Sequence, residues 1–211
     1  MTGCDLDGLL ARIRACRICA DEPAGRTLPH EPRPVVWAQA SARLLVAGQA
    51  PGTRVHATGV PFNDPSGERL RDWMGIDRGT FYDTSRIAIA PMGFCFPGQD
   101  GKGGDLPPRR ECAPAWRAPL MAALPRIELV LAIGQYAQSW HLGVSRGETM
   151  TETVSAWRGY VCGDLDPPVL PMPHPSWRNN AWLRRNPWFE TEVLPFLRGE
   201  VRRLVGGSGG R

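Results

Sequence analysis

The segment Leu129-Val130-Leu131-Ala132-Ile133-Gly134 decides the fold. It is an uninterrupted apolar run that ends in glycine, and residues 135–142 follow it at helical spacing. The pattern therefore predicts a buried strand that leads directly into a helix. A strand with apolar residues on both faces is typical of a parallel sheet that helices cover on both sides.

Three other short apolar segments have the same character, at residues 44–48, 87–90 and 169–172. Helices are expected over residues 7–19, 67–75, 135–142 and 188–204. Residues 20–42, 53–65 and 92–114 are expected to be irregular, the last as a long loop rich in glycine and proline. This order predicts an α/β fold with a central, mostly parallel four-stranded sheet and helices on both faces. We expect a single domain over residues 1–205 and a flexible tail at 206–211.

Composition is that of a globular domain, with 211 residues, 42% of them hydrophobic, and a formal net charge of +4. We see no export signal and no apolar run of bilayer length, so we expect a cytoplasmic monomer with no membrane partner. Lys102 is the single lysine, so arginine carries most of the positive charge. Arginine binds phosphate through two nitrogens at once. A coding bias toward arginine explains the same composition, so charge alone identifies no partner.

Four cysteines form two spaced pairs, Cys16 with Cys19 and Cys95 with Cys112. Such pairs in a reducing compartment indicate a metal or iron–sulfur site rather than disulfides. The alternative is that they are isolated core thiols, because free cysteine is among the most buried residue types.

Ligands of parallel α/β sheets bind at the carboxyl ends of the strands. The segments that follow the expected strands are therefore the ones to inspect for a site. They are residues 48–52, 91–95, 134–135 and 173–176.

These segments together resemble the uracil-DNA glycosylase superfamily. Gly48-Gln49-Ala50-Pro51-Gly52 matches its first motif, Thr58-Gly59-Val60-Pro61-Phe62 its G-x-P-F element, and His174-Pro175-Ser176 its H-P-S motif. The cysteine pairs look like those of the family 4 type, which holds a 4Fe-4S cluster. The resemblance spans roughly residues 10 to 200. It implies a [4Fe–4S] cluster on Cys16, Cys19, Cys95 and Cys112, with zinc on the same thiols as the alternative.

The resemblance implies a DNA repair glycosylase that hydrolyses the N-glycosidic bond of uracil or another deaminated base in DNA. Such enzymes flip the base into a pocket. By resemblance His174 donates a hydrogen bond to the departing base, a contact typically worth about 10²–10³ in rate. The alternative for His174 is a hydrogen-bonded structural histidine.

The resemblance also implies a set of substrate contacts. The backbone of Gln49 and Ala50 lines the pocket, and Pro51 and Gly52 shape a tight loop that lets backbone approach the ligand. Phe62 stacks on the flipped base, with a role in the core as its alternative.

The chain departs from its relatives at two places. Gln49 stands where family 4 has glutamate, and Asp64 is the candidate replacement, with a helix N-cap as its alternative role. The asparagine that reads uracil in relatives is missing after the second strand. Backbone groups of Met92 and Gly93, or the side chain of Asn63, are the candidate readers instead.

The segment after His174 is the expected DNA contact. Ser176 is expected to bind a phosphate, while Trp177 and Arg178 supply an apolar wedge and a basic contact. Lys102, Arg109 and Arg110 suit a second DNA-contacting loop, and a solvated loop is the alternative.

Two other function classes remain open at this point. The missing acid and the missing asparagine fit a non-catalytic iron–sulfur protein that binds nucleic acid and retains the glycosylase fold. An electron-transfer protein needs only the cluster, but leaves the segments around His174 without a purpose.

Overall fold

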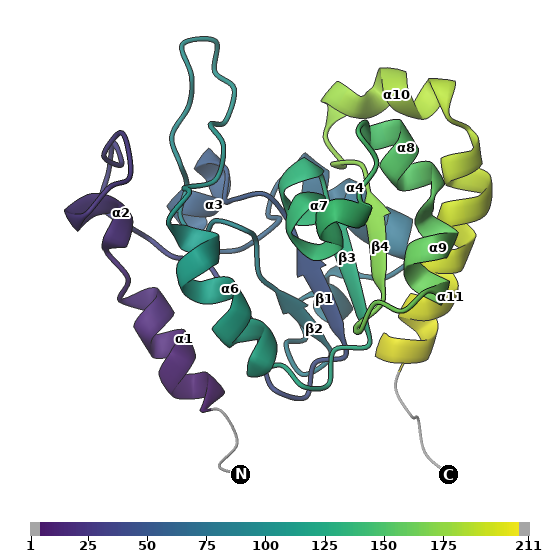
Figure 1. Ribbon diagram of the computed structural model, residues 1–211, viewed down its shortest axis with the longest axis horizontal. Coiled ribbons are helices and arrows are strands. Elements are labelled where there is room, and N and C mark those ends of the chain that lie inside the picture. Colours follow the sequence, from purple (N-terminus) through teal and green to yellow (C-terminus); the bar gives the residue numbers. More distant parts are fainter. Residues whose placement is uncertain (1–4, 207–211) are drawn as a thin grey trace.

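The computed structural model describes residues 5–206, which form a single α/β domain around one four-stranded sheet (Figure 1). The strands are β1 (Leu44–Ala47), β2 (Ile87–Ile89), β3 (Leu129–Ile133) and β4 (Val169–Met172). Their order in the sheet is β2-β1-β3-β4, and all three neighbouring pairs are parallel. The predicted fold class and all four predicted strands are confirmed.

Helices occupy most of the chain between the strands. They are α1 (Leu6–Arg14), α2 (Ile18–Asp21), α3 (Thr53–Thr58), α4 (Pro65–Met74), α5 (Arg78–Phe81), α6 (Cys112–Ala122), α7 (Gln135–Leu142), α8 (Met150–Ser155), α9 (Trp157–Cys162), α10 (Asn180–Arg185) and α11 (Leu194–Val205). Short 3-10 turns lie at Gly143–Ser145 and Trp177–Asn179, and a π-helical turn at Phe189–Val193 leads into α11.

Strand residues alternate between two separate hydrophobic cores. Leu45 and Ala47 of β1 belong to the core beneath α1, α6 and α7, whereas Leu44 and Val46 belong to the core beneath α4, α10 and α11. All four side chains are fully buried. Because successive side chains on a strand point to opposite faces, an all-apolar strand needs helices on both sides. Figure 1 shows these two helical layers flanking the sheet.

Several predicted boundaries were wrong. The helix expected over residues 7–19 is two helices, because the chain leaves helical geometry at Ala15 and Cys16 falls in the break. Residues 53–65, expected as a loop, contain α3, a short helix that ends at Gly59 in the left-handed conformation. Its six residues bury only Val55, too little apolar periodicity to be detected in the sequence.

Helix α4 forms where predicted, and its ends explain its position. The Asp64 side chain caps the first turn by accepting a hydrogen bond from the Gly67 N–H at 2.9 Å. Pro65 occupies the first turn, and Gly75 closes the helix with φ of 69°. The N-cap alternative for Asp64 is therefore confirmed.

The long loop predicted at residues 92–114 contains a hairpin that the sequence did not predict. Gln99 and Asp105 form an antiparallel bridge, and the Asp100 side chain accepts hydrogen bonds from the N–H groups of Lys102 and Gly104. The hairpin projects from the body of the protein (Figure 1). The loop ends three residues earlier than expected, because α6 begins at Cys112.

None of the helices within residues 5–206 has the length and apolar character that crossing a bilayer requires. The predicted tail at 206–211 lies outside the described residues except for Gly206. The cytoplasmic location and the monomeric state stay predictions.

A buried arginine and histidine join α6 to α7. Arg117 is 1% exposed and donates to the Ala90 carbonyl and to Nε2 of His141, both at 2.7 Å. Burial, together with the Arg117 charge, lowers the pKa of His141 to about 3. His141 is therefore a neutral acceptor that helps to satisfy a buried guanidinium.

We predict that His141 makes the protein less stable in acid. Between pH 6.5 and about pH 3 the unfolded histidine binds a proton that the folded one does not, so stability falls as pH falls, by about 1.4 kcal/mol per pH unit. His141→Gln keeps an acceptor for Arg117 without a titrating group. The free energy of unfolding, measured in urea near neutrality and in mild acid, should decrease less in acid for the variant than for the wild type. Parallel losses in the two proteins would contradict the prediction.

Candidate functional site

A cavity of about 690 Å³ opens at the carboxyl ends of the strands, a volume in the range of small-molecule sites. Most of its lining comes from four segments: the loop after β1, the turn that leads into α4, the projecting hairpin and the turn after β4. Gln49, Asp64, Asp105 and His174 are among its lining residues. The structure thus brings together residues that are more than 120 positions apart in the sequence.

The loop after β1, residues 48–52, is held by backbone hydrogen bonds from the segment after β2. The N–H groups of Met92 and Gly93 donate to the carbonyls of Gly48 and Gln49, each at 2.9 Å. The Gln49 side chain donates through Nε2 to the Leu106 carbonyl at 3.3 Å. This bond fixes the amide orientation and leaves Oε1 as the free acceptor of Gln49.

Three predicted base readers are not placed to read a base. The N–H groups of Met92 and Gly93 are already used by the loop after β1, and neither residue lines the cavity. Asn63 also lies outside the cavity lining, and its Oδ1 accepts from Arg78 at 3.2 Å. Pro91, between β2 and Met92, lines the cavity in their place. The sequence could not show that the N–H groups of Met92 and Gly93 and the Oδ1 of Asn63 are already engaged.

Hydrogen bonding fixes the tautomer of His174. Its Nδ1 lies 3.2 Å from the backbone nitrogen of Ser176. A backbone N–H can only donate, so Nδ1 is the acceptor and the proton of the neutral ring lies on Nε2. Asn179 holds the same turn by donating to the His174 carbonyl at 2.7 Å. The ring therefore presents an N–H donor in the cavity.

Burial lowers the pKa of His174 below its ordinary value of 6.5. The nearby carboxylates of Asp64 and Asp105 act in the opposite direction, and Arg178 adds a small further lowering. Burial prevails because a charged imidazolium loses its hydration when it is enclosed. The side chain is thus a neutral hydrogen-bond donor at neutral pH.

Phe62 adopts a strained backbone conformation beside the loop after β1. Its φ is 52°, the one positive value for a non-glycine residue within residues 5–206. A Cβ added to Gly48 would lie 3.2 Å from the Phe62 ring, and one added to Gly67 would lie 1.8 Å from the Phe62 carbonyl oxygen. Both glycines therefore make room for Phe62. Strain of this kind is found at functional sites, and the ring lines the cavity while also packing against the core.

Asp64 and Asp105 both line the cavity, although Asp64 also caps α4. Asp105 was not among the predicted site residues. Its position in the glycine-rich loop gave no signal, because only the folding of the hairpin brings it to the cavity. Arg69 of α4 was also missed, and it donates to the Ser176 carbonyl and to Asn180 Oδ1.

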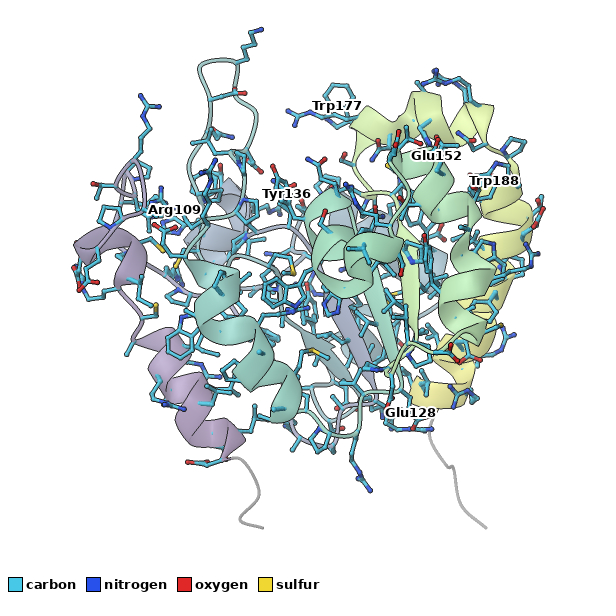
Figure 2. The ribbon with its side chains drawn as sticks, viewed as in Figure 1. Arg109, Glu128, Tyr136, Glu152, Trp177 and Trp188 are labelled. Atoms are coloured by element: carbon cyan, nitrogen blue, oxygen red, sulfur yellow. The ribbon has the colours of Figure 1, made fainter. Side chains whose placement is uncertain are left out.

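The rim of the cavity carries the three predicted DNA contacts. Ser176, Trp177 and Arg178 all line it, and the Trp177 side chain is 73% exposed with Arg178 over its ring. Figure 2 shows Trp177 projecting from the end of the molecule opposite Glu128. An exposed tryptophan beside a free guanidinium is suited to contact a base and a phosphate.

Arg109 is not available for a DNA contact. It forms a salt bridge with Glu111 at 2.9 Å and donates to the Arg26 carbonyl, and its side chain is 14% exposed. Figure 2 shows it near α2. Lys102 and Arg110 are exposed. They remain the predicted contacts of a second DNA-contacting loop.

The four paired cysteines lie in one region at α2 and the start of α6. Cys19 and Cys95 share a small buried cluster, and burial raises the pKa of Cys112 to about 12, with smaller contributions from the other three thiols. The Trp116 indole N–H lies 3.3 Å from Cys16 Sγ. Within residues 5–206, however, no three or more His, Cys, Asp or Glu side chains are arranged to hold a metal ion.

One comparison with known proteins identifies a family. A family model described as the uracil DNA glycosylase superfamily matches residues 36–198. The match covers most of the chain and includes every residue that lines the cavity except Val35.

We predict that His174 carries its proton on Nε2 and has a pKa below 6.5, because burial and the Ser176 N–H both favour the neutral form. Nitrogen–proton NMR correlation spectra recorded through a pH titration report the tautomer and the pKa of each histidine. The spectrum of His174→Gln identifies its signals. A proton on Nδ1, or a pKa above 6.5, would show that the ring is organised differently.

Proposed function

The chain belongs to the uracil-DNA glycosylase superfamily, and we propose that it hydrolyses the N-glycosidic bond of uracil or another deaminated base in DNA. The observation that carries the proposal is the Nε2–H of His174, held in one cavity with the loop of residues 48–52.

The cavity is suited to hold a base that has been flipped out of the helix. Flipping costs a few kcal/mol of lost stacking and pairing, which contacts in the pocket must offset. Phe62 offers an aromatic face to stack on the base. Val55, Pro61 and Pro91 add apolar lining that excludes water.

His174 acts on the departing base. As the bond between base and sugar breaks, its electron pair moves onto the base and negative charge develops on the carbonyl oxygens. A fixed, neutral N–H donor stabilises that charge without being consumed, and one such donor is typically worth about 10²–10³ in rate. The Ser176 N–H and the Asn179 amide keep the imidazole in place before substrate arrives.

Gln49 is suited to orient the attacking water. Its Nε2 is held by the Leu106 carbonyl, so Oε1 is left to accept a hydrogen bond from water. An amide is a poor base, so Gln49 can orient the water while another group accepts the proton that the water loses. The glutamate of related enzymes is therefore not indispensable.

These contacts do not select one particular base. The cavity has no asparagine side chain other than Asn179, whose amide nitrogen already donates to the His174 carbonyl. We therefore propose a pocket that accepts more than one deaminated base. Specificity then comes from shape and from the ease with which a weakly paired base leaves the helix.

Trp177, Arg178 and Ser176 are proposed to contact DNA beside the flipped nucleotide. Trp177 fills the space that the base vacates, and Arg178 neutralises a phosphate. Arg69 ties this turn to α4 and so fixes its distance from the cavity.

We also propose that Cys16, Cys19, Cys95 and Cys112 hold a structural [4Fe–4S] cluster. The chemistry of the donor set supports this, since the thiols of Cys16, Cys19 and Cys95 are close enough to Cys112 to raise its pKa. N–H groups of Trp116 and Phe94 point at Cys16 and Cys112, each at 3.3 Å, as is common for metal-bound sulfur. The cluster would join α2 to α6 and supplies no step of the reaction.

The decisive test of activity is a panel of oligonucleotides that carry different deaminated bases. After incubation with protein, alkali cleaves the abasic product. We expect release of uracil, and we expect His174→Ala to lower the single-turnover rate by about 10²-fold or more. His30→Gln is the control, because it removes a histidine that does not line the cavity.

Release of no base from single- or double-stranded DNA would exclude the glycosylase. Salt-sensitive binding without release would then favour a non-catalytic nucleic-acid-binding protein.

The cluster proposal has its own test. Purified protein is expected to contain iron and inorganic sulfide and to absorb visible light, and Cys112→Ser should lose the metal and melt at a lower temperature. Cys162→Ser is the matched control, since Cys162 is exposed and outside the cysteine pairs. Bound zinc would replace iron in the proposal, and metal-free native protein would show that these are core thiols.

A further inference from the structure

We propose that Asp105 is the catalytic carboxylate of this site, the group that accepts a proton from the attacking water. This inference rests on the glycosylase function proposed above. It addresses the absence of an acid at Gln49, the position where related enzymes carry glutamate.

Hydrogen bonds deliver Asp105 to a defined place. At the base of the projecting hairpin, Leu106 N–H donates to the Gly98 carbonyl at 2.9 Å, and Gln99 pairs with Asp105 across the hairpin. Gln49 then donates to the Leu106 carbonyl at 3.3 Å. Gln49 is thus tied to Leu106, the neighbour of Asp105 in the hairpin.

Gly52 shows how closely Asp105 approaches the loop after β1. A Cβ added to Gly52 would lie 3.2 Å from Oδ2 of Asp105. That distance is tighter than ordinary van der Waals contact, so the carboxylate lies directly against the backbone of the loop. The absence of a side chain at position 52 makes room for it.

The two carboxylates of the cavity differ in their other duties. Oδ1 of Asp64 caps α4 through the Gly67 N–H at 2.9 Å, so this side chain has a structural role. Oδ1 of Asp105 accepts a weaker bond from Gln99 Nε2 at 3.2 Å, and its Oδ2 accepts no hydrogen bond within residues 5–206. Asp105 also acts on His174, because its charge raises the pKa of that ring against the larger effect of burial.

The bond between the base nitrogen and the sugar C1′ breaks, and its electron pair leaves with the base. Water adds its oxygen to C1′, and one water proton passes to Asp105. Asp105 then releases that proton to solvent, while the base anion takes one from solvent. The products are a free base and an abasic sugar, and the enzyme is unchanged.

A catalytic role and a DNA-binding role for Asp105 predict different effects of its charge. A carboxylate at the rim of a DNA-binding cavity repels phosphate, so a purely structural or binding role predicts no benefit from its charge. If Asp105 instead acts on the attacking water and the cationic sugar, its charge is required in the transition state but not for DNA binding.

The test compares Asp105→Asn with wild type on the base that wild type releases most rapidly. We expect the single-turnover rate to fall by about 10²-fold. The dissociation constant for DNA with an abasic-site analogue should stay the same or become tighter. Asp105→Glu should recover part of the rate. Asp100→Asn is the control, because it removes a charge from the same hairpin, while asparagine can still accept from Lys102 and Gly104.

Thermal melting of Asp105→Asn shows whether the variant is folded, and asparagine keeps the acceptor for Gln99. The inference is overturned if Asp105→Asn releases the base at the wild-type rate, whether or not its DNA binding weakens, or if the rate is lost only in Asp64→Asn. An inactive wild-type protein overturns the glycosylase proposal itself, which separates the two failures.

Discussion

Backbone pairing that continues past the ends of β1 and β2 is the constraint on which the site depends. The Ala90 N–H donates to the Val46 carbonyl inside the sheet, and the Met92 and Gly93 N–H groups extend the same ladder to Gly48 and Gln49. The first two residues of the loop after β1 are therefore held by the same kind of backbone bond as a strand. A pre-organised loop costs little entropy when substrate binds, which is what a catalytic site requires.

Three other parts of the cavity are fixed against this loop, each by a separate contact. Phe62 fits over Gly48, the hairpin is tied to Gln49 through Leu106, and Asp105 rests on Gly52. His174 follows β4, the edge strand on the opposite side of the sheet from β2. A Cβ added to Gly134 would lie 4.0 Å from the Cβ of His174. The parallel order of the strands brings all these carboxyl ends to one edge. The helices that bury the sheet are what keep that edge rigid.

The sequence was a good guide wherever a short segment carries its own physical signature. Residues 129–133 are apolar on both faces, so they predicted a doubly covered parallel strand, and Asp64-Pro65 with Gly75 bounded α4. Motifs directly after strands placed Gln49 and His174 in one cavity, as the structure confirms. It was a poor guide to α3, because a helix of six residues has too few positions for a period to show.

The amino-acid sequence by itself determined the sheet, its two covered faces and the family, since these follow from local apolar patterns and from motifs of fixed spacing. Only the tertiary structure decided which polar groups are free to act. It used the N–H groups of Met92 and Gly93 to hold a loop, and it buried Arg117 against His141. It also brought Asp105 to the cavity on a hairpin. The reason is physical: a hydrogen-bonding group can act on substrate only if no neighbour has already satisfied it, and its neighbours are distant in sequence.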